Sequence, residues 1–108
     1  MSSSDRPVYL VAQLAVKDLD DFMQRYVFGV SGQMQKAGAE VLAAAPPQIL
    51  EGDQDVNRTV LIRFPSLEIA TNWYESEEYL PFRELRKTEL TTSGAVQFVE
   101  EFDPSAFA

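Results

Sequence analysis

The sequence of 108 residues predicts an α+β domain with its elements in the order strand, helix, strand, strand, helix, strand. Two observations indicate this class: short apolar runs with strand character lie at both ends and in the middle of the chain, and two stretches with helical periodicity and cap residues separate them. A chain of this length forms one domain by the usual prior. We expect that domain over residues 8–102, a flexible N-terminus at 1–7 and a C-terminal tail at 103–108.

The first strand is predicted over residues 8–16, VYLVAQLAV, in which Gln13 is the one polar residue. A strand with one face in water would alternate, so this near-continuous apolarity indicates that both faces are covered. Helices can cover one face, but a chain this short cannot easily supply a second layer. We therefore expect Tyr9, Val11 and Ala15 to lie on a face that a partner covers.

The first helix is predicted over residues 19–37, where apolar residues recur at three- and four-residue steps. Asp18 is a suitable N-cap, and Gly38 a suitable C-terminal stop. Gly29 and Gly32 lie inside this helix, and each costs about 1 kcal/mol relative to alanine. We expect a kink or a close approach of another segment at these two positions.

Two strands are predicted next, at residues 40–45 (EVLAAA) and 58–64 (RTVLIRF). Residues 48–51 are expected to extend the former beyond a bend at two prolines, and residues 51–55 form an acidic loop. This loop lacks the glycine and glutamate register of a calcium site. In the later strand, one face carries Val60, Ile62 and Phe64, and the other carries Thr59, Leu61 and Arg63.

The second helical region is predicted in two pieces, because Pro81 lacks an amide hydrogen and clashes in a helix interior. Ser66 caps a helix over residues 67–75, and Pro81 opens another over 81–92. Thr91 to Gly94 are expected to break the chain before a last strand at 95–102. The inward positions of the helix at 67–75 are predicted to be Ile69, Ala70, Trp73 and Tyr74.

The resulting βαββαβ order is the plan of a ferredoxin-like domain, in which a four-stranded antiparallel sheet carries both helices on one face. The other face would expose an apolar patch that is unusual for a monomer. Packing two such sheets face to face removes this exposure and gives a two-fold symmetric homodimer. We therefore predict a dimeric α/β barrel.

The motifs of the chain resemble those of domain-of-unknown-function family 1330. The resemblance covers about residues 8–102 and is carried by YLVAQLAV near the start, EGD at 51–53, FPS at 64–66 and the signature WYxSxEYxxxRxxR from Trp73 to Arg86. It implies the dimeric α/β-barrel superfamily, which includes cofactor-free monooxygenases of the antibiotic-biosynthesis type, haem-degrading relatives and muconolactone-isomerase-like enzymes. The family itself has no settled activity. The chain departs from the usual family pattern in lacking glycine pairs at 38–39 and 43–45.

Composition excludes several kinds of chemistry. The chain has no histidine and no cysteine, which removes the usual general base near neutral pH, the common zinc and haem ligand, and thiolate nucleophiles. We expect neither a metal nor an organic cofactor. The net charge of -8 disfavours nucleic acids and anionic membranes as partners. Without an apolar run of membrane length or a signal peptide, a cytoplasmic location is expected.

Six residues are candidates for ligand binding. Gln13 and Arg63 are polar residues within apolar strands, where they either orient a ligand in the barrel interior or form hydrogen bonds in a dimer interface. Arg83 and Arg86 either attract an acidic ligand or form ion pairs with nearby glutamates. Trp73 and Tyr79 lie on the same helical signature, with Trp73 either a core aromatic or a wall of the site. Tyr26 is either a core residue or an acid in a pocket.

These residues support two hypotheses. In the first, the chain binds or transforms a small organic molecule, an acid among the candidates, without metal or organic cofactor, in a monooxygenase- or isomerase-like manner. In the alternative, the chain is a non-catalytic regulatory or structural homodimer, and the polar groups only fix the register of the subunits. The sequence names no catalytic base, and whether the protein is an enzyme stays open at this stage.

Overall fold

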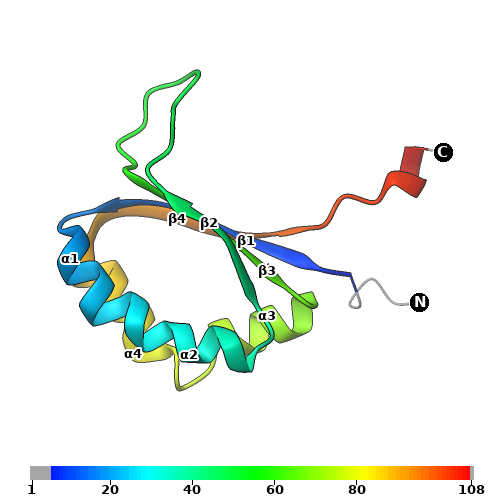
Figure 1. The fold of residues 1–108 in the computed structure, drawn as a ribbon, viewed down its shortest axis with the longest axis horizontal. Helices are drawn as coiled ribbons and strands as arrows, with labels where there is room; N and C mark the ends of the chain where they lie inside the picture. Colours follow the sequence, from blue (N-terminus) through cyan, green and yellow to red (C-terminus); the bar gives the residue numbers. More distant parts are fainter. Residues whose placement is uncertain (1–5, 108) are drawn as a thin grey trace.

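The computed structural model describes residues 6–107, and its elements follow the predicted order (Figure 1). Five of the seven residues of the predicted flexible N-terminus, 1–5, lie outside the described residues. The elements are β1 (Val8–Val16), α1 (Leu19–Phe22), the π-helical turn η2 (Met23–Val27), α2 (Phe28–Lys36), β2 (Glu40–Ala45), β3 (Arg58–Phe64), α3 (Leu67–Tyr74), α4 (Leu80–Leu85), the π-helical turn η3 (Arg86–Leu90), β4 (Thr91–Glu100) and the 3₁₀ turn η4 (Pro104–Phe107).

The four strands form one sheet in the order β2-β3-β1-β4, and every neighbouring pair is antiparallel. The helices all lie on one face of this sheet, and the β2–β3 loop projects away from the opposite side (Figure 1). The register places Leu10 of β1 between Ile62 of β3 and Phe98 of β4, so apolar side chains from three strands meet under the helices. The predicted α+β, ferredoxin-like fold is confirmed.

Burial along β1 alternates despite its uniform apolarity. The side facing the helices buries Val8, Leu10, Ala12 and Leu14, whereas Tyr9, Val11 and Gln13 on the opposite side are only partly buried. We call that opposite side, with Leu61 and Arg63 of β3, the bare face. The prediction that Ala15 lies open on this face is wrong: Ala15 pairs with Ser93 in the regular register but is buried, at the end of β1 where the Asn57 side chain bonds both backbone groups of Val16 at 2.9 Å.

The first helical region runs without a break from Leu19 to Lys36, but its irregularity is not at the glycines. Asp18 caps it as predicted, with Oδ1 accepting from the Asp21 amide at 3.1 Å. The irregularity of the helix is the π-helical turn η2, which comes before both glycines at which the sequence predicts a kink or a close approach. Gly29 does face a close neighbour, since a Cβ there would collide with the ring of Phe82, but Gly32 faces open space.

The turn before β2 agrees with the prediction, whereas the segment after β2 does not. Gly38 ends the first helix with a φ of 71°, a conformation that favours glycine. The expected continuation of β2 over residues 48–51 is wrong: the strand ends at Ala45, and residues 46–57 form a loop. The two prolines that follow Ala45 cannot donate to the sheet, which explains the end of the strand. The exposed side chains of Ile49 and Leu50 lie in this loop.

The second helical region is confirmed in two pieces. Ser66 caps α3, with Oγ accepting from the Ile69 amide at 3.2 Å, and Pro81 lies in the first turn of α4. Ala70 and Trp73 are buried as predicted, whereas Ile69 is 38% exposed and was wrongly placed inward. Ile69 lies beside a shallow surface groove between α3 and α2 instead of under the helix.

The predicted break at Thr91–Gly94 is wrong, because β4 begins directly after η3 at Thr91. These four residues pair with the end of β1, where Gly94 stands opposite Leu14. A Cβ at Gly94 would lie 2.9 Å from the Leu14 side chain, so the glycine permits the strands to approach closely. What resembled a turn in the sequence is therefore a tightly paired strand.

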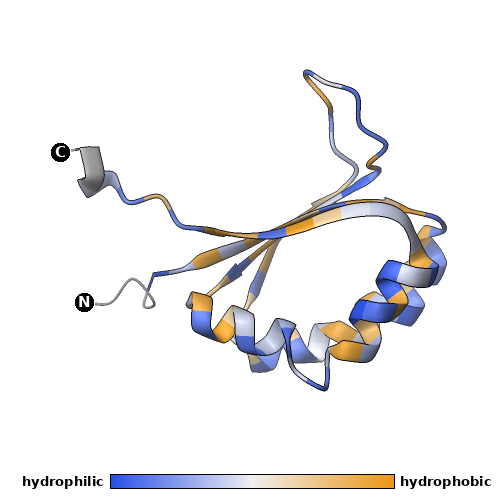
Figure 2. Ribbon diagram, turned by 180° about the vertical axis from the view of Figure 1, so that it is seen from behind, coloured by the Kyte–Doolittle hydropathy of each residue, from blue (hydrophilic) through white to orange (hydrophobic). Residues whose placement is uncertain are grey.

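Aromatic rings fill the core between helices and sheet. Phe64 and Tyr79 are almost fully buried, and the Trp73 ring lies 5.5 Å from the Phe64 ring and 4.1 Å from the Tyr79 ring, centroid to centroid. Hydrophobic residues lie on both the sheet and the helices, as Figure 2 shows, while the outer helical surfaces are mixed. This packing attaches α3 and α4 to the sheet.

The contrast between Gly29 and Gly32 gives a stability test. We expect Gly32→Ala to raise the free energy of unfolding by about 1 kcal/mol, because alanine favours the helix and meets no neighbour. Gly29→Ala has the same helix preference but collides with Phe82, and overpacking typically costs about 1–3 kcal/mol. Urea denaturation of both variants measures the difference. Equal stabilisation by both substitutions would contradict a tight contact at Gly29.

Candidate functional site

A cavity of about 270 Å³ lies between the first helical region and the helix-covered face of the sheet. Its wall is mostly apolar, because β1 and β3 contribute their helix-facing side chains and the helix contributes its inward stripe. No Asp or Glu is among the lining residues of the described chain. The apolar wall includes Leu10, Ala12, Leu14, Val60 and Ile62 from the sheet, and Phe22, Val30 and Met34 from the helix.

Three polar side chains meet in this cavity. Tyr26 comes from η2, Tyr79 from the residue before α4, and Arg86 from η3. The hydroxyls of Tyr26 and Tyr79 are 2.5 Å apart, and either can be the donor. Arg86 is 6% exposed, and its Nη2 donates to the hydroxyl of Tyr74 at 3.4 Å. A guanidinium and two coupled hydroxyls thus form one polar group in an apolar cavity.

Arg86 is a buried cation without a carboxylate partner among the described residues. Its Nε is buried and donates no hydrogen bond within the described chain. Burial opposes the charged form, but the neighbouring hydroxyls of Tyr79 and Tyr26 outweigh it, so the pKa of Arg86 lies above its ordinary value. The side chain is therefore positively charged at every physiological pH, with donor capacity still unused.

Tyr26 is held in its protonated form. Burial raises the pKa of Tyr26 well above its ordinary value, and the nearby Tyr79 hydroxyl adds to the shift more strongly than Arg86 opposes it. The Tyr26 hydroxyl can therefore donate a hydrogen bond or a proton, but it is not a base near neutral pH. Together with Arg86, it presents donors to a negatively charged or electron-rich group.

Both π-helical turns deliver a polar residue to the cavity. Turn η2 carries Tyr26, and turn η3 carries Arg86. Such wide turns are rare and occur frequently at functional sites. An exposed ion pair joins the same two turns, with Arg25 Nη2 2.8 Å from Glu89 Oε1. The two turns therefore lie side by side and hold their polar residues in one place.

Of the six predicted site residues, Trp73, Tyr79 and Arg86 line this cavity, whereas Gln13, Arg63 and Arg83 do not. The sequence predicts a cavity on the bare face, whereas this cavity lies on the opposite side of the sheet. On the bare face, Arg63 Nε lies 3.6 Å from Glu101 Oε1, which also accepts from the Tyr9 hydroxyl at 2.9 Å. Gln13 stands between Thr59 and Ala95 in the neighbouring strands.

Arg83 and Arg86 have different surroundings although they are three residues apart. Arg83 Nη1 donates to the Tyr74 carbonyl at 3.2 Å, its guanidinium lies 5.2 Å from the Tyr74 ring centroid, and its Nε lies 3.8 Å from Glu84 Oε2. The predicted alternative of an ion pair with a nearby glutamate therefore describes Arg83. It does not describe Arg86, which points into the cavity.

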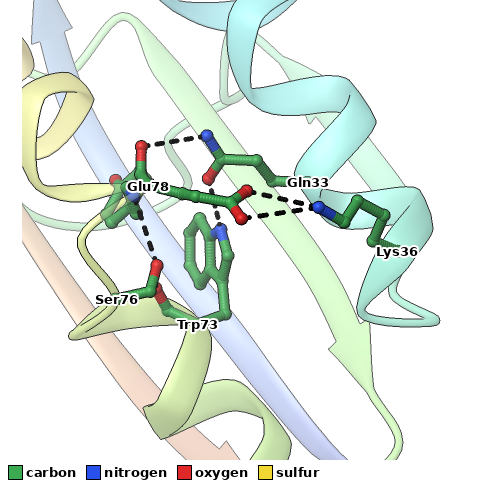
Figure 3. A network of polar contacts seen from close by, with 6 residues as sticks. Gln33, Lys36, Trp73, Ser76 and Glu78 are labelled. Atoms are coloured by element: carbon green, nitrogen blue, oxygen red, sulfur yellow. Dashed lines mark hydrogen bonds and ion pairs between the residues drawn. The ribbon is translucent and has the colours of Figure 1, made fainter.

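A polar network holds Trp73 in the cavity wall (Figure 3). The indole Nε1 donates to Gln33 Oε1 at 3.0 Å, and Gln33 Nε2 donates to the Glu78 carbonyl at 3.1 Å. Lys36 Nζ lies 3.4 Å from a Glu78 carboxylate oxygen. These contacts attach α2 to the turn between α3 and α4, beside the Trp73 ring that lines the cavity.

Sequence reasoning missed one residue of this site, Arg58 at the start of β3. It lines the cavity, and it shares the face of β3 that carries Val60 and Ile62. That parity was visible in the sequence, but an arginine at the end of a strand is usually solvated. In the described chain, no cluster of carboxylates suited to a metal is present, and no helix has the length and apolarity to cross a bilayer.

The chain belongs to the family described as Domain of unknown function (DUF1330), whose model matches residues 7–102. This agrees with the resemblance seen in the sequence motifs. No curated protein matches the chain.

Solved structures share its fold at low sequence identity. A candidate antibiotic biosynthesis monooxygenase from Caulobacter crescentus CB15 has a TM-score of 0.68 at 10% identity, with 94% of each chain covered. A dabb family protein with a ferredoxin-like fold from Mesorhizobium loti has a TM-score of 0.63 at 9% identity, covering 91% of this chain and 99% of its own. A dimeric protein with a ferredoxin-like fold from Bacteroides fragilis NCTC 9343 has a TM-score of 0.57 at 12% identity, covering 88% and 96%.

The raised pKa of Tyr26 predicts a loss of stability at alkaline pH. The folded state keeps the proton at pH values where the unfolded chain releases it, so the free energy of unfolding falls as pH rises above about 10. The slope from this group is at most about 1.4 kcal/mol per pH unit. Tyr26→Phe removes that part of the slope, which urea denaturation between neutral and alkaline pH measures. Tyr9→Phe on the bare face is the control, and an unchanged slope in Tyr26→Phe would contradict the assignment.

Proposed function

We propose that this protein binds a small, largely apolar organic molecule with an acidic group, in the cavity between the sheet and the helices. One observation carries the proposal: Arg86 is a buried, charged guanidinium with an unused donor and no carboxylate partner among the described residues. A buried charge is costly unless it is paired. An anionic ligand supplies the missing partner.

The size of the cavity defines the size of the ligand. An apolar cavity of about 150 Å³ is large enough to bind benzene. The cavity of about 270 Å³ therefore has room for one ring with substituents, or for a short aliphatic chain of similar volume. The apolar wall favours a hydrocarbon body, and the polar group selects for one acidic end.

Each polar residue has a distinct role in this proposal. Arg86 binds the acidic group through its guanidinium, which suits carboxylates and other planar anions. One of the two coupled hydroxyls of Tyr26 and Tyr79 donates to the other, and the remaining hydroxyl proton is available to the same acidic group or to a neighbouring oxygen. Trp73 forms the wall against which the body of the ligand packs. Of the other residues predicted from the sequence, Gln13 and Arg63 lie on the bare face and do not contact this ligand. Arg83 contacts Tyr74 from outside the cavity.

The arrangement favours chemistry on a molecule that is already an anion. Tyr26 is protonated and cannot remove a proton near neutral pH, and no histidine or carboxylate lines the cavity. A cofactor-free monooxygenase-like step, in which a CH2 group of an already ionised ligand and O2 give a C=O group and water, fits these groups, whereas an isomerase-like step needs a base that the lining residues do not supply. The fold shared with a candidate antibiotic biosynthesis monooxygenase supports this reaction class. A non-catalytic homodimer is the alternative, in which the same groups have only a structural role.

The proposed assembly is a homodimer in which two bare faces pack together. Tyr9, Val11 and Leu61 remain partly exposed on the sheet of the single chain, and a similar structure is described as dimeric. Such packing would cover this surface and form the barrel predicted from the sequence. Gln13 and Arg63 would then lie between the two sheets.

A matched pair of arginine variants tests the binding site. We expect thermal-shift screening against small carboxylic acids to identify ligands that stabilise the wild-type protein, by about 2.7 kcal/mol at a concentration one hundred times Kd. Arg86→Met should abolish this stabilisation, because the anion loses its partner. Arg83→Met removes a nearby charge outside the cavity and should retain it. A screen without any stabilising acid would overturn the proposal and favour the non-catalytic alternative.

The dimer has a separate test in Val11→Asp. A carboxylate at the centre of the bare face would be buried without a partner, at a cost of several kcal/mol. We expect the wild-type protein to be dimeric at micromolar concentration and Val11→Asp to be monomeric, measured by light scattering coupled to size exclusion. Leu80→Asp adds the same charge to an exposed position on α4 and should leave the mass unchanged. A wild-type monomer under these conditions would refute the proposed assembly.

A further inference from the structure

We propose that the molecule bound in this cavity carries a second acidic group, which Arg58 binds at the rim; this inference rests on the proposed function. The ligand class is then a small dicarboxylic acid or an equivalent molecule, with two anionic ends joined by an apolar spacer. Three observations lead to this class: the pairing of the arginines, the position of Arg58, and the apolar wall of the cavity.

The pairing of the arginines separates two of them from the rest. Four of the six arginines in the chain lie within ion-pair distance of a carboxylate: Arg6, Arg25, Arg63 and Arg83. The two exceptions within the described chain are Arg58 and Arg86, and both line the cavity. Among the described residues, Lys17 and Lys87 also have no carboxylate within ion-pair distance, but neither lines the cavity, so position distinguishes Arg58 and Arg86. Because both arginines line the same cavity, we infer that both contact the same ligand.

Arg58 is positioned to meet a ligand at the open edge of the cavity. It lies at the first position of β3, opposite Leu14 of β1, and both residues line the cavity. Its Nη1 donates to the carbonyl of Ala44 on β2 at 3.1 Å, and Ala44 is also a lining residue. This bond holds the guanidinium beside the cavity and leaves its other N–H groups available.

The two cations come from opposite walls. Arg58 belongs to the sheet, and Arg86 belongs to η3 in the helical layer. The wall of the same cavity includes the apolar side chains of Val60, Ile62 and Val96. A molecule that reaches both guanidinium groups must therefore place its charges at separate ends and its hydrocarbon part against this wall. A monocarboxylic acid satisfies only one of the two.

The test compares acids that differ by one carboxylate. Linear monocarboxylic acids and α,ω-dicarboxylic acids of the same carbon number, from about four to ten carbons, are titrated by calorimetry into the full-length protein. We expect one dicarboxylic acid length to bind about tenfold more tightly than its monocarboxylic counterpart, since a charge-assisted bond at a partly exposed rim contributes roughly that factor. Arg58→Met should remove this preference and leave the affinity for the monocarboxylic acid unchanged.

Two further variants make each outcome decisive. Arg63→Met removes a cation from the bare face and should retain the preference. Arg58→Gln keeps a donor for Ala44 and should still lose the preference, which separates the charge from the local backbone contact. Equal binding of both acid classes to the wild type would overturn this inference while the proposed function stands. Loss of both acid classes in Arg58→Gln would also overturn it, whereas no binding of any acid to the wild type would remove the proposed function itself.

Discussion

The contact between Trp73 and Tyr79 is the interaction on which the rest of this structure depends. These rings lie 4.1 Å apart between their centroids, and Trp73 also packs on Phe64 of β3, so they join both pieces of the second helical region to the sheet. Gln33 bonds the Trp73 indole and attaches the first helix to the same point. Trp73 and Tyr79 also line the cavity, so this cluster forms one part of its wall.

The cavity and its charge both reduce stability in the isolated chain. The apolar wall of the open cavity stays in contact with solvent in the isolated chain, so the hydrophobic stabilisation from burying it is lost. Arg86 adds the cost of a buried cation that makes one long hydrogen bond to Tyr74. Larger side chains on the helix, or a leucine in place of Arg86, would have removed both costs. Under the proposed function, a bound anion with an apolar body would offset both costs.

The sequence was sufficient for the fold because its signals were local. The caps at Asp18 and Ser66, the glycine stop at Gly38 and the position of Pro81 each depend on a few neighbouring residues, and all four were confirmed. The site was harder to predict because it depends on contacts distant in the chain. Nothing near Tyr26 indicates that its hydroxyl meets Tyr79, and two arginines three positions apart in one motif have opposite surroundings. Strand parity could have identified Arg58, but not that its guanidinium turns toward Ala44 at the rim.

The two polar residues of the helical layer that meet in the cavity, Tyr26 and Arg86, both lie in π-helical turns. A π turn contains one residue more than an α-helical turn, so it widens the helix locally. Tyr26 and Arg86 lie in such turns, on segments joined by the ion pair of Arg25 and Glu89 at the surface. The periodicity of the sequence therefore hides these residues, since in a regular helix the position of Tyr26 is simply part of the apolar face. Tyr26 lies on the same inward stripe as Phe22 and Val30, so its contacts across the cavity, and not its spacing along the helix, distinguish it from a core residue.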